Sequence, residues 1–155
     1  MEIKGVQDFY SDEFAHCYGC GRLNHDGFQI KTRWEGDETV SVYTPRKYHT
    51  AMEGFVYGGL LASLIDCHGT GSGALAYARE HGIELTEYNA PRFVTGSLTV
   101  NYKKPTPIEG PLEIRGKIKE IKGRKVISEI NLWAGGEICV TGEVLAVLIP
   151  ENFGK

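Results

Sequence analysis

Residues 54–66 have the sequence Gly-Phe-Val-Tyr-Gly-Gly-Leu-Leu-Ala-Ser-Leu-Ile-Asp. The pair Gly58 and Gly59 opens an apolar run that predicts a helix from Gly59 to about Glu80. The start of a helix offers unpaired backbone N–H groups and a partial positive charge, and glycine lets a carbonyl oxygen approach them closely. Asp66 lies in the middle of the run, where a carboxylate is costly to bury. Together these features predict a site for carbonyl chemistry, in which N–H groups stabilise negative charge on oxygen.

The spacing between Gly58 and Asp66 predicts more than one copy of the chain. Eight helical residues at ~1.5 Å each separate the two positions by ~12 Å. One helix therefore cannot present both groups to one carbonyl carbon, whereas two antiparallel copies could, each supplying half of the site. We expect a homodimer with a two-fold axis and composite sites.

The alternation of apolar and polar residues predicts six strands around this helix. Two strands precede the helix and four follow it, and they span Phe28–Trp34, Thr39–Tyr43, Phe93–Lys104, Leu112–Ile121, Val126–Trp133 and Glu137–Ile149. This order indicates an α+β fold, with one long helix across a six-stranded antiparallel sheet. The 155 residues contain no repeat or linker, so we expect a single domain over residues 1–155.

Composition and charge exclude several classes of partner. The net charge of −3 gives no footprint of nucleic-acid binding. Apolar stretches stay well below the ~20 residues of a membrane span, and the first residues show no secretion signal. Four cysteines in a chain of this length do not resemble a disulfide framework. We expect a cytoplasmic protein that binds neither nucleic acid nor membranes and needs no cofactor.

A Cys-x-x-Cys pair, Cys17 and Cys20, raises the question of a metal site. A structural zinc site needs four ligands, usually supplied as two pairs, and the chain has no second pair of this kind. Cys67 and His68 could complete a set only if the fold brought them near. We therefore predict no metal site and a loop built on cysteines, glycines and Asn24.

Several further residues are candidates for the site. Period-two alternation places the hydroxyls of Thr95, Ser97 and Thr99 on one strand face, where Thr95 could hold a water or orient a carboxylate. Four more residues are predicted to contact substrate, namely His49, Tyr57, Lys103 and Lys104. The two lysines are included because phosphates attract basic side chains. His68 lies about 200° around the helix from Asp66, so we expect it to point elsewhere.

With these residues in view, the chain resembles the hotdog-fold acyl-CoA thioesterases of the PaaI type. The resemblance covers about residues 16–148 and rests on Tyr57-Gly58-Gly59 with Asp66, on the strand that begins at Thr95, and on the Cys17 to Gly27 loop. Two positions depart from the family pattern. Tyr57 stands where a histidine is usual, and Ala51 stands where some relatives have asparagine.

This resemblance implies a role for each motif residue. Asp66 would be the general base or nucleophile, the N–H of Gly58 or Gly59 would polarise the thioester carbonyl, and Thr95 would help hold the attacking water. It also implies a homodimer or a homotetramer with acyl-CoA bound between subunits. The alternative is a non-catalytic hotdog module that binds an acyl-CoA as a ligand. Turnover of acyl-CoA would distinguish the two.

Overall fold

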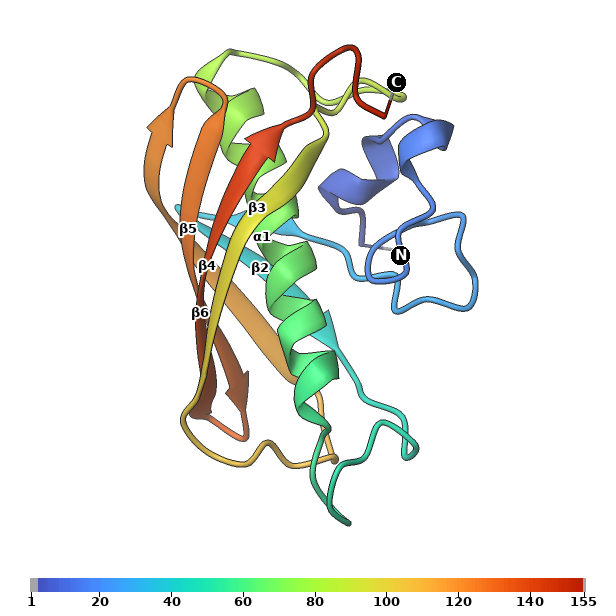
Figure 1. Ribbon diagram of the computed structural model, residues 1–155, viewed down its shortest axis with the longest axis vertical. Coiled ribbons are helices and arrows are strands. Elements are labelled where there is room, and N and C mark those ends of the chain that lie inside the picture. The colour runs from blue at the N-terminus through green and yellow to red at the C-terminus, as the bar shows by residue number, and fades with distance from the viewer. Residues whose placement is uncertain (1–2, 155) are drawn as a thin grey trace.

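The computed structural model describes residues 3–154, in which a long helix crosses one face of an antiparallel sheet (Figure 1). The helix, α1, spans Gly58–Glu80. The strands are β1 (Arg33–Glu35), β2 (Glu38–Tyr43), β3 (Phe93–Tyr102), β4 (Leu112–Lys122), β5 (Lys125–Ala134) and β6 (Glu137–Leu148). They form a six-stranded sheet in the order β1-β2-β4-β5-β6-β3. The predicted α+β architecture is confirmed, and β3 lies at an edge of the sheet.

Close packing of α1 on the sheet explains two of the glycines in its second half. A methyl group added at Gly69 would lie 2.4 Å from Cβ of Val144 on β6, and one at Gly73 would lie 3.1 Å from Cβ of Ala146. The apolar residues of the first half, Leu60, Leu61, Leu64 and Ile65, are all buried in the core. The helix therefore approaches the sheet closely where its own residues are small.

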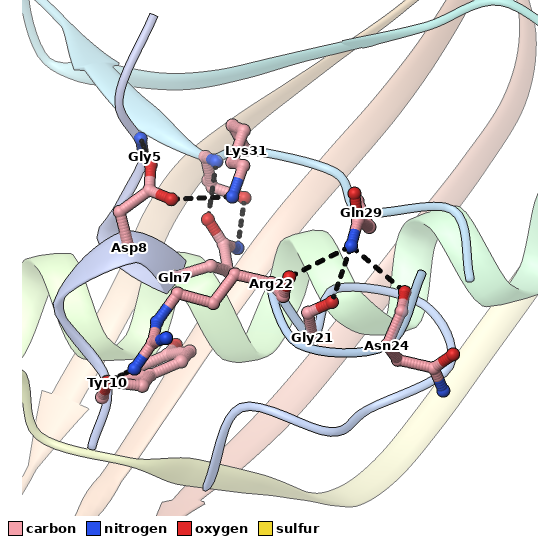
Figure 2. A network of polar contacts seen from close by, with 10 residues as sticks. Gly5, Gln7, Asp8, Tyr10, Gly21, Arg22, Asn24, Gln29 and Lys31 are labelled. Atoms are coloured by element: carbon pink, nitrogen blue, oxygen red, sulfur yellow. Dashed lines mark hydrogen bonds and ion pairs between the residues drawn. The ribbon is translucent and has the colours of Figure 1, made fainter. Parts of the chain in front are cut away.

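The N-terminal segment covers α1 on the side away from the sheet (Figure 1). It contains two short 3₁₀ helices, η1 (Val6–Phe9) and η2 (Asp12–Phe14). The side chain of Gln7 is fully buried; its amide donates to Thr32 Oγ1, and its carbonyl accepts from the Thr32 N–H. Figure 2 shows this contact beside the ion pair between Lys31 and Asp8. Because it is covered on both sides, α1 is buried from Cys67 to Ala76.

The first strand is shorter than predicted, so the expected start at Phe28 is wrong. Only Arg33–Glu35 pairs with β2. Gln29 has a positive φ of 51°, which takes the chain out of the extended conformation. Residues 30–32 then bond to the N-terminal segment instead, since the Val6 N–H donates to the Thr32 carbonyl.

A buried polar network joins α1 to β2. His68 is fully buried; its Nε2 lies 2.9 Å from Thr39 Oγ1 and its Nδ1 lies 2.7 Å from Ser41 Oγ. Ser72 Oγ continues the network at 2.8 Å from Thr39 Oγ1. Burial lowers the pKa of His68 from 6.5 to about 3. The expectation that His68 points away from Asp66 is confirmed, because the ring points into the protein with both nitrogens in contact with hydroxyls.

Acid should destabilise the fold through His68. Below pH 6.5 the unfolded chain binds a proton at this residue, whereas the folded chain stays neutral down to about pH 3. The contribution of His68 to the free energy of unfolding is therefore complete above pH 6.5 and is lost as the pH drops from 6.5 toward 3. The loss amounts to several kcal/mol, because one pKa unit is about 1.4 kcal/mol. Urea unfolding between pH 7 and pH 4 measures this slope. The slope should shrink in His68→Gln and persist in His25→Gln, which changes an exposed histidine.

Candidate functional site

Asp66 and Thr95 meet on the open side of α1. The Thr95 hydroxyl donates a short hydrogen bond to Asp66 Oδ1, across 29 positions of sequence. Both residues are half-buried, so the carboxylate contacts the protein on one side and remains accessible on the other. A hydroxyl that donates to one carboxylate oxygen orients the group and leaves the second oxygen free to accept a proton.

A β-bulge aims Thr95 at the helix. Thr95 pairs with Ala146, which is fully buried under α1, but Ser97 pairs with Leu145, so the register shifts between them. The prediction that Thr95, Ser97 and Thr99 share one face is therefore wrong. Thr95 faces α1, and the other two face the opposite side of the sheet. The bulge is centred on Gly96, and such bulges commonly re-aim a side chain beside a functional site.

The same bulge brings Tyr102 to the start of α1, which the sequence analysis did not anticipate. Tyr102 lies seven positions after Thr95, so strict alternation would place the two on opposite faces. In the structure Tyr102 pairs with Val140, on the α1 side, and its hydroxyl donates to the Gly58 carbonyl at 2.8 Å. The bulge is the reason why the sequence pattern alone does not reveal this contact.

The start of α1 has no side-chain cap. Gly58 is the first helical residue, and the preceding residue, Tyr57, caps it only through its backbone and makes no side-chain cap. Tyr57 is half exposed, and its ring lies across Gly59, where an added methyl group would be 2.1 Å from the phenolic oxygen. A helix start with uncapped N–H groups favours a negatively charged oxygen.

A pocket of about 350 Å³ adjoins this helix start. The structure brings Gly58, Lys103 and Lys104 together on its wall, along with Tyr102 and Ala51. Lys104 also forms an ion pair with Glu137 at 3.0 Å. Asp66 is not among the residues of this pocket, in keeping with the ~12 Å between the two halves of the site along one helix.

His49 does not line this pocket. Its ring packs edge-on against Phe28 at 5.6 Å and against Tyr48 at 4.7 Å. Its Nδ1 accepts from the Arg46 N–H at 3.0 Å. Partial burial, with help from the Arg46 charge, lowers the pKa of His49, so the ring favours its neutral form.

The cysteine loop lies against α1 at Cys67, the residue that follows Asp66 in the sequence. The sulfurs of Cys17, Cys20 and Cys67 all lie within 4.8 Å of one another. Hydrogen bonds with the thiols of Cys20 and Cys67 lower the pKa of the Cys17 thiol, and hydrogen bonds from nearby backbone N–H groups lower it to a smaller extent. The sequence predicts that Cys67 joins Cys17 and Cys20 only if the fold brings it near them, and the fold does so. His68 points away into the core.

The half of α1 that carries Asp66 is open along one stripe. Gly59 and Ser63 are four positions apart, as are Ala62 and Asp66, so the four lie on one side of the helix, and each is only half-buried. The neighbouring edge strand is exposed from Gly96 to Thr99. Within residues 3–154, no helix is both long enough and apolar enough to cross a membrane.

Comparison with known proteins places the chain in a family. Residues 53–141 match the model of the thioesterase superfamily. A thioesterase superfamily protein from Shewanella loihica PV-4 has a solved structure with 45% identity and a TM-score of 0.68, covering 90% of this chain and 98% of that one. This likeness confirms the expected hotdog fold.

Curated relatives carry the name acyl-coenzyme A thioesterase THEM4. The Xenopus laevis protein is 30% identical over 110 residues, which are 71% of this chain and 44% of the relative. The Mus musculus protein is 27% identical over 111 residues, which are 72% and 42% of the respective chains. This chain therefore spans less than half the length of these relatives. By the family match and the likeness of the solved structure, the chain belongs to the thioesterase superfamily.

Proposed function

We propose that the protein hydrolyses an acyl-CoA thioester to a carboxylic acid and free CoA. The observation that carries the proposal is the hydrogen bond from Thr95 to Asp66, made at a bulge beside α1 in a thioesterase superfamily domain. The names of the curated relatives supply the substrate class.

Asp66 activates the attacking group in one of two ways. As a general base, it takes a proton from water on Oδ2 while the water oxygen attacks the carbonyl carbon. The tetrahedral intermediate then collapses, the C–S bond breaks, and the sulfur leaves as CoA thiol after protonation. As a nucleophile, the carboxylate attacks the carbonyl itself, the C–S bond breaks and CoA leaves as a thiolate, and water then hydrolyses the resulting mixed anhydride to release the acid and restore Asp66. Both routes balance with water as the only co-reactant.

Helix N–H groups supply the oxyanion stabilisation. Negative charge develops on the thioester oxygen in the transition state, and the amide of Gly58 or Gly59 is the donor best placed to meet it. Since these amides lie ~12 Å from Asp66 along one helix, they come from a second copy of the chain. The open stripe of α1 and the exposed β3 edge are the surfaces for this homodimer, or for a dimer of dimers.

The pocket at the helix start receives the CoA portion of the substrate. Lys103 is exposed and Lys104 pairs with Glu137 at the surface, so both are available to contact phosphates. Tyr57 covers the amides where a histidine is usual in the family and, being half exposed, it can rotate aside. His49 lies outside this pocket in an aromatic cluster, so its contact with substrate stays a prediction. A cytoplasmic location stays a prediction.

Release of free thiol from a panel of acyl-CoAs tests the activity. The panel spans short, medium, long and aromatic acyl groups. Turnover of at least one member supports the enzyme. The alternative, a binding module, predicts tight calorimetric binding of acyl-CoA with no thiol released from any member of the panel.

Thr95→Ala should lower turnover more than it weakens binding of a non-hydrolysable acyl-CoA analogue. The hydroxyl orients Asp66 toward the attacking water, which matters in the transition state and little in the ground state. Thr95→Ser is the matched control, because it keeps the hydroxyl and should retain most of the activity. Equal losses of binding and turnover in Thr95→Ala would remove the orienting role.

A further inference from the structure

Three thiols from two distant parts of the chain form a compact cluster outside the residues assigned to catalysis. Cys17 and Cys20 come from the N-terminal loop and Cys67 from α1, 50 positions after Cys17. Cys20 is 2% exposed and Cys67 is 7% exposed, while Cys17 is half-buried and gives access from the surface. Among the His, Cys, Asp and Glu side chains of the described residues, these three cysteines lie close enough together to share a metal ion.

The spacing of the sulfurs fits a shared metal ion. Cys17 Sγ and Cys67 Sγ are 3.8 Å apart, far beyond the ~2.0 Å of a disulfide bond. Two thiolates bound to one tetrahedral zinc at ~2.3 Å each are separated by ~3.8 Å. The third sulfur lies within the same 4.8 Å limit, so all three can reach one ion with small movements.

The loop is shaped around these sulfurs. An added methyl group at Gly19 would lie 2.3 Å from Cys67 Sγ, so the backbone approaches the thiol as closely as only glycine allows. Figure 2 shows the Gln29 amide donating to the carbonyls of Gly21, Arg22 and Asn24, which fixes the chain that follows Cys20. These contacts hold the loop in place before any ion binds, which lowers the cost of assembling the site.

A buried polar group beside the cluster has no partner. Tyr10 is 1% exposed, and its hydroxyl makes no hydrogen bond in the described structure. Burial raises the pKa of Tyr10, the positive charge of Arg92 opposes this rise, and smaller contributions from Cys20, Cys67 and Cys17 add to it. The three sulfurs are what indicate a metal ion, and the Tyr10 hydroxyl is a further buried polar group that lacks a partner.

We propose that Cys17, Cys20 and Cys67 bind a thiophilic metal ion, with Zn²⁺ as the biological occupant. Thiolate ligands select such ions, and three protein ligands leave the fourth position to water. The guanidinium of Arg92 lies over the Tyr10 ring, 4.8 Å from its centroid, and its charge acts to lower the pKa of Cys20. The ion ties the N-terminal loop to α1 at the residue directly after Asp66, and it takes no part in hydrolysis.

Cobalt substitution tests this site on the full chain. The protein is reduced, freed of metal with a chelator, and titrated with Co²⁺ under argon. We expect one equivalent to give the intense thiolate-to-cobalt absorption of a tetrahedral site, and Zn²⁺ to displace it. Cys17→Ser and Cys67→Ser should each weaken binding at least ~10²-fold, since mutation of groups that merely support a ligand already costs 10–100-fold. Cys139→Ser is the matched control, because Cys139 is equally buried and contacts the Glu137 carbonyl instead.

Thermal unfolding gives a second readout that needs no variant. An ion that binds only the folded state should raise the midpoint of the wild-type protein in a concentration-dependent way, and chelator should reverse the rise. Reduced wild-type protein that shows no thiolate-to-cobalt band and no rise in midpoint would overturn the proposal. So would a band that Cys139→Ser weakens as much as Cys67→Ser does.

Discussion

Asp66→Asn should reduce thioester hydrolysis by at least ~10²-fold while the fold stays intact. The substitution keeps the size of the side chain and its contact with the Thr95 hydroxyl, but the amide cannot take a proton from water or attack a carbonyl. The loss should appear in kcat, because the carboxylate acts on the reacting atoms. The measurement is thiol release on the best acyl-CoA, beside circular dichroism and thermal unfolding of the same sample.

Glu80→Gln serves as the matched control for this prediction. It removes a carboxylate from the same helix at its exposed C-terminal end, far from Thr95. Wild-type turnover in Glu80→Gln together with a loss in Asp66→Asn assigns the effect to position 66. A folded Asp66→Asn variant that keeps wild-type turnover would show that the proposed mechanism is wrong.

Gly58→Pro should cost a similar ~10²-fold in kcat through loss of one backbone N–H. Removing one oxyanion donor typically costs 10²–10³-fold. Proline suits this position structurally, because Gly58 is the first residue of α1 and the preceding Tyr57 has φ −69° and ψ 139°, which a residue before proline adopts readily. The helix should therefore form normally without the donor.

Gly58→Ala separates the N–H from the side chain. Alanine keeps the donor, and its methyl group would lie 3.4 Å from the Tyr102 ring, an ordinary contact. Most of the activity should survive in Gly58→Ala and disappear in Gly58→Pro. Equal activity in both would move the oxyanion donor to Gly59 or to another group.

The sequence predicts the fold well because its signals are local. Leu60, Leu61, Leu64 and Ile65 indicate the helix, and alternation after Arg92 predicts the four long strands to within two residues at each end. The sequence predicts that Thr95 could orient a carboxylate, but that this carboxylate is Asp66 depends on where the helix crosses the sheet, which no local pattern contains.

Other features depend on contacts that no local pattern contains. The bulge at Gly96 inserts one residue into β3, which reverses the face of every later side chain and brings Tyr102 to Gly58. The end of β1 depends on Gln29 and on bonds to the N-terminal segment. The meeting of Cys17 with Cys67 depends on where a loop of 11 residues packs, and alternation and helical period say nothing of that.

Mixing two inactive variants tests the composite site most directly. Asp66→Asn and Gly58→Pro chains are unfolded together, refolded, and compared with each variant refolded alone. In a mixed dimer, one of the two sites combines an intact Asp66 with the intact Gly58 of the other copy, so random pairing should restore about a quarter of wild-type turnover. If both groups acted from a single chain, every site in the mixture would carry a defect. Mass spectrometry would detect whether mixed dimers form. If they form but show no more turnover than the separate variants, the account is contradicted.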